Sequence, residues 1–212
     1  NFISFLGWNP GTEQEIFSLK ELEGTFGFDK VAKAAAVFDR KKLTWYNQQY
    51  MRALSIEELY QKTEPFLINA NLVSKDNQDS INFAKKAIVL EQQRSENFAD
   101  LATNIAFLFA DTLVFDKELV AWKKSTIQDA KEKLQQLHTV LNSIEEEKWI
   151  ESQLKELVVV WIKSNEYGVG DVLWPTRVSL SGKKNSPGPF EIMEVLGKQK
   201  TLDRINNTIS LI

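Results

Sequence analysis

The amino-acid sequence predicts a mainly α-helical fold, and three observations support this prediction. Apolar residues recur every three or four positions along most of the 212 residues. Residues that cap helices precede several of these runs, and alternating strand-like patterns are rare. The composition, 43% hydrophobic and 26% charged, is typical of a globular protein with one or two apolar cores.

Residues 1–54 form the first predicted unit. Their apolar beginning is expected to end a helix near the Asn-Pro-Gly sequence at 9–11. Ser18 and Asp39 are expected to cap two further helices, the second of which runs to Leu54.

The next stretch predicts a helical bundle. A Ser-x-x-Glu capping box begins at Ser55, and the helix after it is expected to kink or break at Pro65. Two more helices are expected, one that starts at Asp76 or Asp79 and one over residues 98–109.

A long amphipathic pattern covers residues 127–144 and is typical of a coiled-coil-like helix. Ser143 and Glu146 form another capping-box pattern, which would place the glutamates at 145–147 in the first turn of the following helix. The glycines at 168 and 170 are expected to end that helix.

The most unusual stretch runs from Trp174 to Gly197. A Trp-Pro pair precedes Arg177, and a Gly-Lys-Lys turn precedes a Ser-Pro-Gly-Pro sequence. Ser186 is expected to cap a helix that begins at Pro187. Because a helix start carries free N–H groups and a partial positive charge, this corner suits a phosphate or the edge of a base.

Charge and composition exclude several kinds of protein. A net charge of −3 argues against non-specific nucleic-acid binding, although residues 177–204 hold six Lys or Arg against three acids. The chain has no Cys and one His, His138, which is expected at the surface, so neither a zinc site nor a nucleophilic triad is predicted. No P-loop and no apolar run of membrane-span length is present.

Two blocks of the sequence resemble bacterial-type glutamyl-tRNA synthetases. The first comprises FLGWNPGTEQEIFSLKEL and KAAAVFDRKKLTWYNQQYMRALSIEELYQKTEPFL. The second, RVSLSGKKNSPGPFEIMEVLGKQKTLDRI, is similar to the family pattern R-x-A-L-T-G-x-x-x-S/T-P-G-x-F-E-I-L-x-L-L-G-K-E. The likeness spans nearly the whole chain and is looser from Asn71 to Tyr167.

This resemblance implies an α-helix-cage architecture. Residues 1–54 would end the small mixed stem-contact fold, 55–115 would form a first anticodon-binding bundle and 116–212 a second. The chain would recognise the anticodon of tRNA-Glu as the C-terminal part of a cytoplasmic, monomeric ligase that attaches glutamate using ATP and Mg²⁺. The catalytic domain would precede it, so this part is expected to need no cofactor or metal and to be inactive alone.

The family pattern also implies site residues. Arg94 would meet the first anticodon base, Arg177 and the corner at 186–189 the second and third, and Val169 would make a neighbouring apolar contact. Many relatives have Thr at the place of Ser186 and a larger apolar residue at that of Pro189. The full anticodon set is Arg94, Val169, Arg177, Ser186, Pro187, Gly188 and Pro189.

Contacts with the RNA backbone are expected from Arg52, Lys183 and Lys184. Each arginine also has a structural alternative. Arg52 could form a salt bridge on a helix surface, Arg177 could form a buried salt bridge, and Arg94 could be a solvated loop residue.

Two other interpretations stay open at this level. One is a free-standing helical protein-interaction module, which the acidic total charge and the long heptad-like helix would fit. The other is the same part of a non-discriminating or glutamine-specific relative.

Overall fold

The computed structural model describes residues 1–33 and 36–212 and confirms a mainly α-helical fold. Within those residues there is no β-strand, only one isolated antiparallel bridge between Trp8 and Val31. The α-helices are α1 (Leu19–Thr25), α2 (Arg40–Ala53), α3 (Ile56–Asn69), α4 (Gln78–Gln92), α5 (Phe98–Phe109), α6 (Ile127–Ser143), α7 (Glu151–Ser164), α8 (Val169–Ser181), α9 (Pro189–Leu196) and α10 (Lys198–Leu211). Short 3₁₀ turns occupy η1 (Ser4–Leu6), η2 (Phe28–Lys30), η3 (Lys117–Val120) and η4 (Glu146–Lys148).

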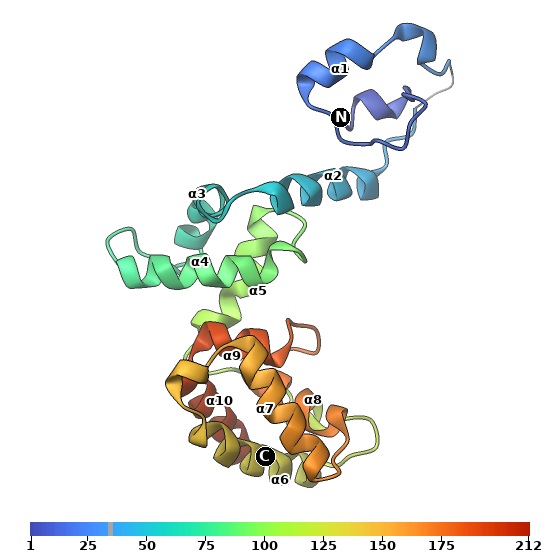
Figure 1. Ribbon diagram of the computed structural model, residues 1–212. Helices are drawn as coiled ribbons and strands as arrows, with labels where there is room; N and C mark the ends of the chain where they lie inside the picture. The colour runs from blue at the N-terminus through green and yellow to red at the C-terminus, as the bar shows by residue number, and fades with distance from the viewer. Residues whose placement is uncertain (34–35) are drawn as a thin grey trace.

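The N-terminal unit lies at one end of the molecule (Figure 1) and is held together by aromatic rings. Trp8 and Phe17 are buried, and their ring centroids lie 6.0 Å apart. The predicted helix before residue 9 is only the η1 turn, whereas the predicted Ser18 cap is confirmed by a full capping box with Glu21.

Helix α2 joins this unit to the rest of the fold. Asp39 accepts from the backbone N–H groups of Lys41 and Lys42 and so caps the helix as predicted. Tyr46 packs into the aromatic cluster, and Met51 reaches the main apolar core. Helix α2 therefore contributes one buried side chain to the N-terminal unit and another to the main core.

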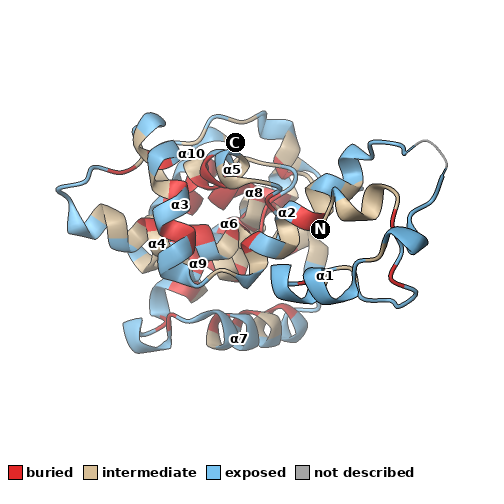
Figure 2. Ribbon diagram, turned by 90° about the horizontal axis from the view of Figure 1, so that it is seen from above, coloured by how far each residue is buried: buried red, intermediate tan, exposed pale blue. Residues whose placement is uncertain are grey.

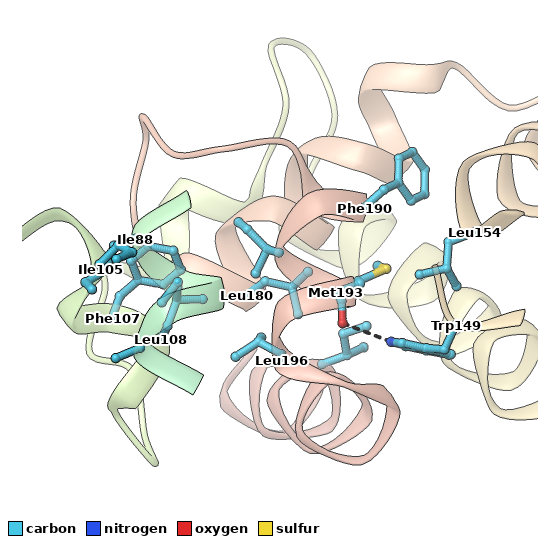
Figure 3. Close-up of a cluster of buried hydrophobic side chains, with 14 of the residues drawn as sticks. Ile88, Ile105, Phe107, Leu108, Trp149, Leu154, Leu180, Phe190, Met193 and Leu196 are labelled. Atoms are coloured by element: carbon cyan, nitrogen blue, oxygen red, sulfur yellow. Dashed lines mark hydrogen bonds between the residues drawn. The ribbon is translucent and has the colours of Figure 1, made fainter. Parts of the chain in front are cut away.

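The remaining helices form two groups. Helices α3, α4 and α5 pack against one another and are called the first helical group; α6 to α10 do the same and are called the second helical group (Figure 1). One apolar core runs through both (Figure 3), since the cluster that contains Ile88 and Leu108 also contains Leu154 and Met193. In Figure 3 the indole Nε1 of Trp149 donates to the carbonyl of Met193 at 2.9 Å, which ties α9 to the chain before α7.

The break predicted at Pro65 is wrong, because α3 continues to Asn69. An interior proline costs a helical hydrogen bond, of the order of 3 kcal/mol. Leu59 and Leu67, on either side of the proline, are both fully buried, so their packing outweighs this cost. The predicted Ser55 capping box is present.

Two predicted caps are also wrong. Asn77, and neither neighbouring aspartate, caps α4 by accepting from the Ser80 N–H. Ser143 closes α6 instead of opening a helix, and the glutamates at 145–147 lie around η4, ahead of α7. Several residues near a helix start can act as its cap. The helix begins where its apolar face is then directed inward.

Burial follows the helix periodicity (Figure 2), with red stripes on the inner faces of the helices and pale blue outside. On α6 the buried residues are Ala130, Leu134, Leu137 and Leu141, as the pattern predicted. None of the helices in residues 1–33 and 36–212 combines the length and the hydropathy needed to span a bilayer.

Candidate nucleic-acid interface

The Trp-Pro-x-Arg sequence lies within a regular helix, not in an irregular corner. Pro175 is inside α8, which continues to Ser181 and ends at Gly182, whose φ of 66° is in the left-handed region that favours glycine. Val172 and Val178 are buried on either side of Pro175, so packing holds the helix together through the proline. Arg177 is therefore presented from a rigid element.

The guanidinium of Arg177 is oriented by its own helix. Its central carbon lies 4.6 Å from the ring centroid of Trp174, one helical turn earlier, and Nη2 donates to the carbonyl of Lys184 at 3.2 Å. No carboxylate among the described residues lies within 4 Å of it, so the buried salt bridge that was the alternative for Arg177 is absent. Most of its donors are left without a protein acceptor.

Arg94 follows the end of α4, in the first helical group. Its Nε lies 3.9 Å from an oxygen of Glu91, too long for a hydrogen bond, and about half of its side chain is exposed. The pKa of Arg177 is lowered by burial and, secondarily, by the positive charge of Arg94. The two arginines come from different helical groups and are near enough for the charge of Arg94 to act on Arg177.

The start of α9 differs from the prediction. Gly188 is the N-cap and Pro189 the first helical residue, so Ser186 does not cap this helix. Ser186 and Pro187 are buried, and the Ser186 hydroxyl donates to the carbonyl of Pro187 at 3.1 Å. The Gly188 N–H, expected to be free for a ligand, donates to the carboxylate of Glu191.

The corner therefore presents less positive charge than predicted. A carboxylate at a helix start satisfies orphan N–H groups and offsets the helix dipole. Pro189 and Gly188 stay half-buried at the surface, where they could meet a base by packing rather than by hydrogen bonding.

Val169 does not lie with this cluster along its helix. It is the first residue of α8 and is 47% exposed, whereas Arg177 stands eight residues later. At 1.5 Å per residue this separates their backbones by roughly 12 Å. A ligand that meets both must extend along α8.

The cations expected at the RNA backbone have different surroundings. Lys184 is exposed. Lys183 donates to the carbonyl of Asn104 at 3.3 Å and lies 5.0 Å from the Phe107 ring centroid, and burial lowers its pKa. Arg52 donates to the carbonyl of Gln93 at 2.7 Å, so its partner is a helix end and not the predicted salt-bridge carboxylate.

A groove of about 770 Å³ opens beside Arg94, between α4 and α9. Its floor is apolar, with Val89, Leu90 and Val195. The α4 wall carries Lys85, Lys86 and Arg94, and the opposite wall carries Glu151, Glu191 and Glu194. The two helical groups are thus incompletely packed on this side.

Three contributors were missed from the sequence. The first is Glu91, which is only 5% exposed, and burial raises its pKa. The positive charges of Arg94 and Lys183 lower this pKa, whereas the negative charge of Glu191 raises it further. Glu91 and Arg94 are three residues apart, a spacing that brings side chains together on a helix, so the sequence held a signal that could have shown this pair. Trp174, which stacks on Arg177, had a similar signal, but Arg204 on the apolar side of α10 had none.

This surface combines hydrogen-bond donors with an aromatic ring. No group of three or more potential metal-ligating side chains occurs in the part of the chain that the structure describes. What the surface offers is two arginine side chains, an indole stacked on one of them, and the half-buried Gly188 and Pro189. Guanidinium groups of this kind match base edges and phosphates.

Comparison with known proteins identifies relatives that match nearly the whole chain. The chain is 38% identical over 216 residues to a glutamate–tRNA ligase of Clostridium botulinum, with 100% of this chain and 43% of that protein covered. It is 36% identical to the glutamate–tRNA ligase of Clostridium tetani, covering 97% of this chain and 41% of the relative.

Solved structures give the same result. A glutamate tRNA ligase from Elizabethkingia meningosepticum, crystallised in complex with its amino acid, superposes with a TM-score of 0.79 at 28% identity, covering 99% of this chain and 40% of that chain. The enzyme from Elizabethkingia anophelis gives 0.78, also at 28% identity, over 99% of this chain and 39% of that one. This chain thus spans about two fifths of the relatives' length, and the resemblance inferred from the sequence is confirmed.

The family described as anticodon binding domain matches residues 58–209, which begin in α3 and end in α10. This range holds both helical groups together with Arg94 and Arg177. Since the match covers well over half of the chain, this chain belongs to the anticodon binding domain family.

Proposed function

We propose that this chain reads the anticodon of tRNA-Glu as part of a glutamate–tRNA ligase. The observation that carries the proposal is the pairing of Arg94 and Arg177. They come from different helical groups, their like charges interact, and Arg177 has no carboxylate partner among the described residues. Two guanidinium groups held together against their repulsion favour an anionic or acceptor-rich ligand.

The arrangement suits single-stranded bases better than a duplex. Anticodon bases are unstacked and expose their edges, which arginine can meet through its planar fork. Stacking on Trp174 fixes the plane of the Arg177 guanidinium before RNA binds, so less conformational entropy is lost on binding. Arg94 would meet the first base, and Arg177 with the corner at 186–189 the second and third.

The remaining assignments belong to the same proposal. Residues 1–54 would be the end of the stem-contact fold, 55–115 the first anticodon-binding bundle and 116–212 the second. The whole ligase would be a cytoplasmic monomer that joins glutamate to tRNA using ATP and Mg²⁺ bound in its catalytic part. Nothing in the comparisons favours a free-standing interaction module.

The test is the affinity of this chain for an RNA hairpin with the anticodon stem and loop of tRNA-Glu. Arg177→Ala should weaken binding by roughly 1–3 kcal/mol, about five- to 150-fold. If Arg177 reads a base, the loss should shrink on a hairpin already changed at the second or third anticodon position. If it contacts phosphate only, the loss should be the same on every hairpin.

Arg40→Ala is the matched control, because Arg40 is an exposed arginine at the start of α2, away from the cluster. It should change affinity for this hairpin little. Equal losses in the two variants, or no measurable preference of the unmodified chain for the cognate anticodon, would refute the proposed function.

A further inference from the structure

The C-terminal end of α5 is closed in an unusual way. Every helix leaves its last carbonyls without an intrahelical partner, and the N–H that follows usually bonds back to one of them. Each of the other α-helices in the described residues has such a bond at its C-cap; α5, whose C-cap is Ala110, has none. Its last carbonyls need hydrogen-bond donors from elsewhere.

Arg204 of α10 supplies most of them. It is 3% exposed, and its Nη2 donates to the carbonyls of Phe107 at 2.8 Å, Leu108 at 3.3 Å and Ala110 at 2.7 Å. Its Nη1 donates to the carbonyl of Leu180 in α8. One guanidinium thus connects three helices of both helical groups.

Two lysines of the second helical group reinforce this contact. Lys200 donates to the carbonyl of Leu108 at 2.9 Å, and Lys183 to that of Asn104 at 3.3 Å. Arg204 and Lys200 meet the last carbonyls of α5, at the negative end of its dipole, where positive charge is favoured, and Lys183 contacts the same helix about one turn earlier. We call Arg204, Lys200 and Lys183 the α5 clasp.

The clasp is directional. No carboxylate in the described chain lies within 4 Å of these cations, so their hydrogen bonds go to backbone carbonyls, while Asp111 acts on Arg204 and Lys200, and Glu91 on Lys183, from farther away. Hydrogen bonds to several carbonyls of one helix end fix an angle as well as a distance. A tilt of the second helical group would break them together.

The clasp and the groove lie between different helices of the two groups. On the side of α4 and α9, which pack against each other, the two groups also leave an open groove of about 770 Å³. On the side of α5 and α10, the clasp joins them. Arg94 belongs to one group and Arg177 to the other, so their separation depends on this joint.

We propose that Arg204, with Lys200 and Lys183, is a positioning residue that sets the distance between Arg94 and Arg177 so that one anticodon loop meets both. This inference rests on the proposed function. Two contacts held at the right spacing bind as one ligand-sized site, whereas loosely joined contacts lose most of this advantage.

The test compares Arg204→Met and Lys200→Met with Lys198→Met. Lys198 is a matched control, because it also lies on α10 and donates to a carbonyl near a helix end, that of Ile144 at 2.7 Å, but within the second helical group. Lys200→Met keeps Arg204 in place and is the deciding variant if Arg204→Met does not fold.

The chain has no cysteine, so spin labels can be placed without background. Asn82→Cys on α4 and Lys163→Cys on α7 are exposed sites on the two groups. We expect the label–label distance distribution to broaden in both clasp variants and not in Lys198→Met. Affinity for the anticodon hairpin should fall at least about tenfold in the same variants.

An unchanged distance distribution in a folded clasp variant would overturn the inference, as would a broadened one with unchanged RNA affinity. Broadening and loss of equal size in Lys198→Met would also overturn it. The distance measurement needs no RNA, so failure of the proposed function, seen as no cognate binding by the unmodified chain, is distinguishable from failure of the clasp.

Discussion

The surroundings of Arg204 and Arg177 differ although both arginines belong to the second helical group. Arg204 is 3% exposed, with its two terminal nitrogens bonded to four backbone carbonyls. Arg177 lies on the surface of α8, stacks on Trp174 and donates to a single carbonyl. Burial lowers the pKa of Arg204 to about 10, so it still carries its charge at neutral pH.

The difference separates an architectural arginine from one available to a ligand. A guanidinium has five N–H donors. Arg204 directs most of them to the ends of other helices, and its free energy of interaction is already realised in the folded protein. Arg177 keeps most of its donors free and has its plane fixed by an indole, which is the state expected of a binding group.

The largest expected effect is the loss of stability when Arg204 is replaced. Arg204→Met should lower the free energy of unfolding by roughly 2–4 kcal/mol, because it leaves buried carbonyls of α5 without donors. Arg177→Met should cost less than about 1 kcal/mol, the value of an exposed cation–π contact. Urea denaturation followed by circular dichroism measures both, and similar losses for the two variants would contradict the distinction.

The next effect is a change in RNA affinity when Arg177 is replaced. Arg177→Lys keeps the positive charge but removes the planar fork, so affinity for the cognate hairpin should fall roughly tenfold if the arginine meets a base edge. A contact made to phosphate alone would survive this change with little loss. Titration of the cognate hairpin with both proteins decides between them: a roughly tenfold loss indicates a base-edge contact, and little loss indicates a phosphate contact.

A smaller effect concerns Arg94, whose fork is half exposed and near Glu91. Arg94→Gln should change the preference for C over U at the first anticodon position by up to about tenfold, since one good base contact is worth roughly 1–3 kcal/mol. The fold should be unaffected, as a thermal melt would verify. An unchanged preference would return Arg94 to the role of a solvated loop residue.

The smallest effect is a pH dependence that arises at Glu91. Burial raises its pKa, so the folded protein holds this proton more tightly than the unfolded chain does. Stability from this group is therefore present below the unfolded pKa of about 4.5 and is lost as pH rises through the higher folded pKa. Glu91→Gln should flatten this decline when unfolding is measured between pH 4 and pH 7. A difference between the two proteins that stays constant with pH would contradict the assignment.

Local sequence determined most of the helices. Ser18, Ser55 and Asp39 cap helices where predicted, since a side-chain oxygen that reaches an N–H two or three residues ahead needs nothing from the rest of the fold. The apolar spacing of residues 127–144 likewise placed the buried face of α6. The family resemblance came from sequence alone, and so did the choice of Arg94 and Arg177.

Local rules failed where packing overrode them. Pro65 was expected to kink or break its helix, yet α3 continues past it, because buried residues on either side hold the helix in place, and Pro175 lies inside α8 in the same way. Ser186 was expected to cap α9, but it is buried, and Gly188 with Glu191 takes that role. Each of these outcomes depends on how much apolar surface the alternative would expose.

Tertiary structure alone decided how the two helical groups are joined. Arg204 and its acceptors in α5 are 94 to 97 residues apart in sequence, and no periodicity marks an arginine on an apolar helix face as the partner of a distant helix end. Unpaired carbonyls exist only once α5 has formed and its following N–H has turned away. Sequence therefore determined which helices form and which arginines to test, while the separation of Arg94 from Arg177 arose from contacts that only the folded chain brings together.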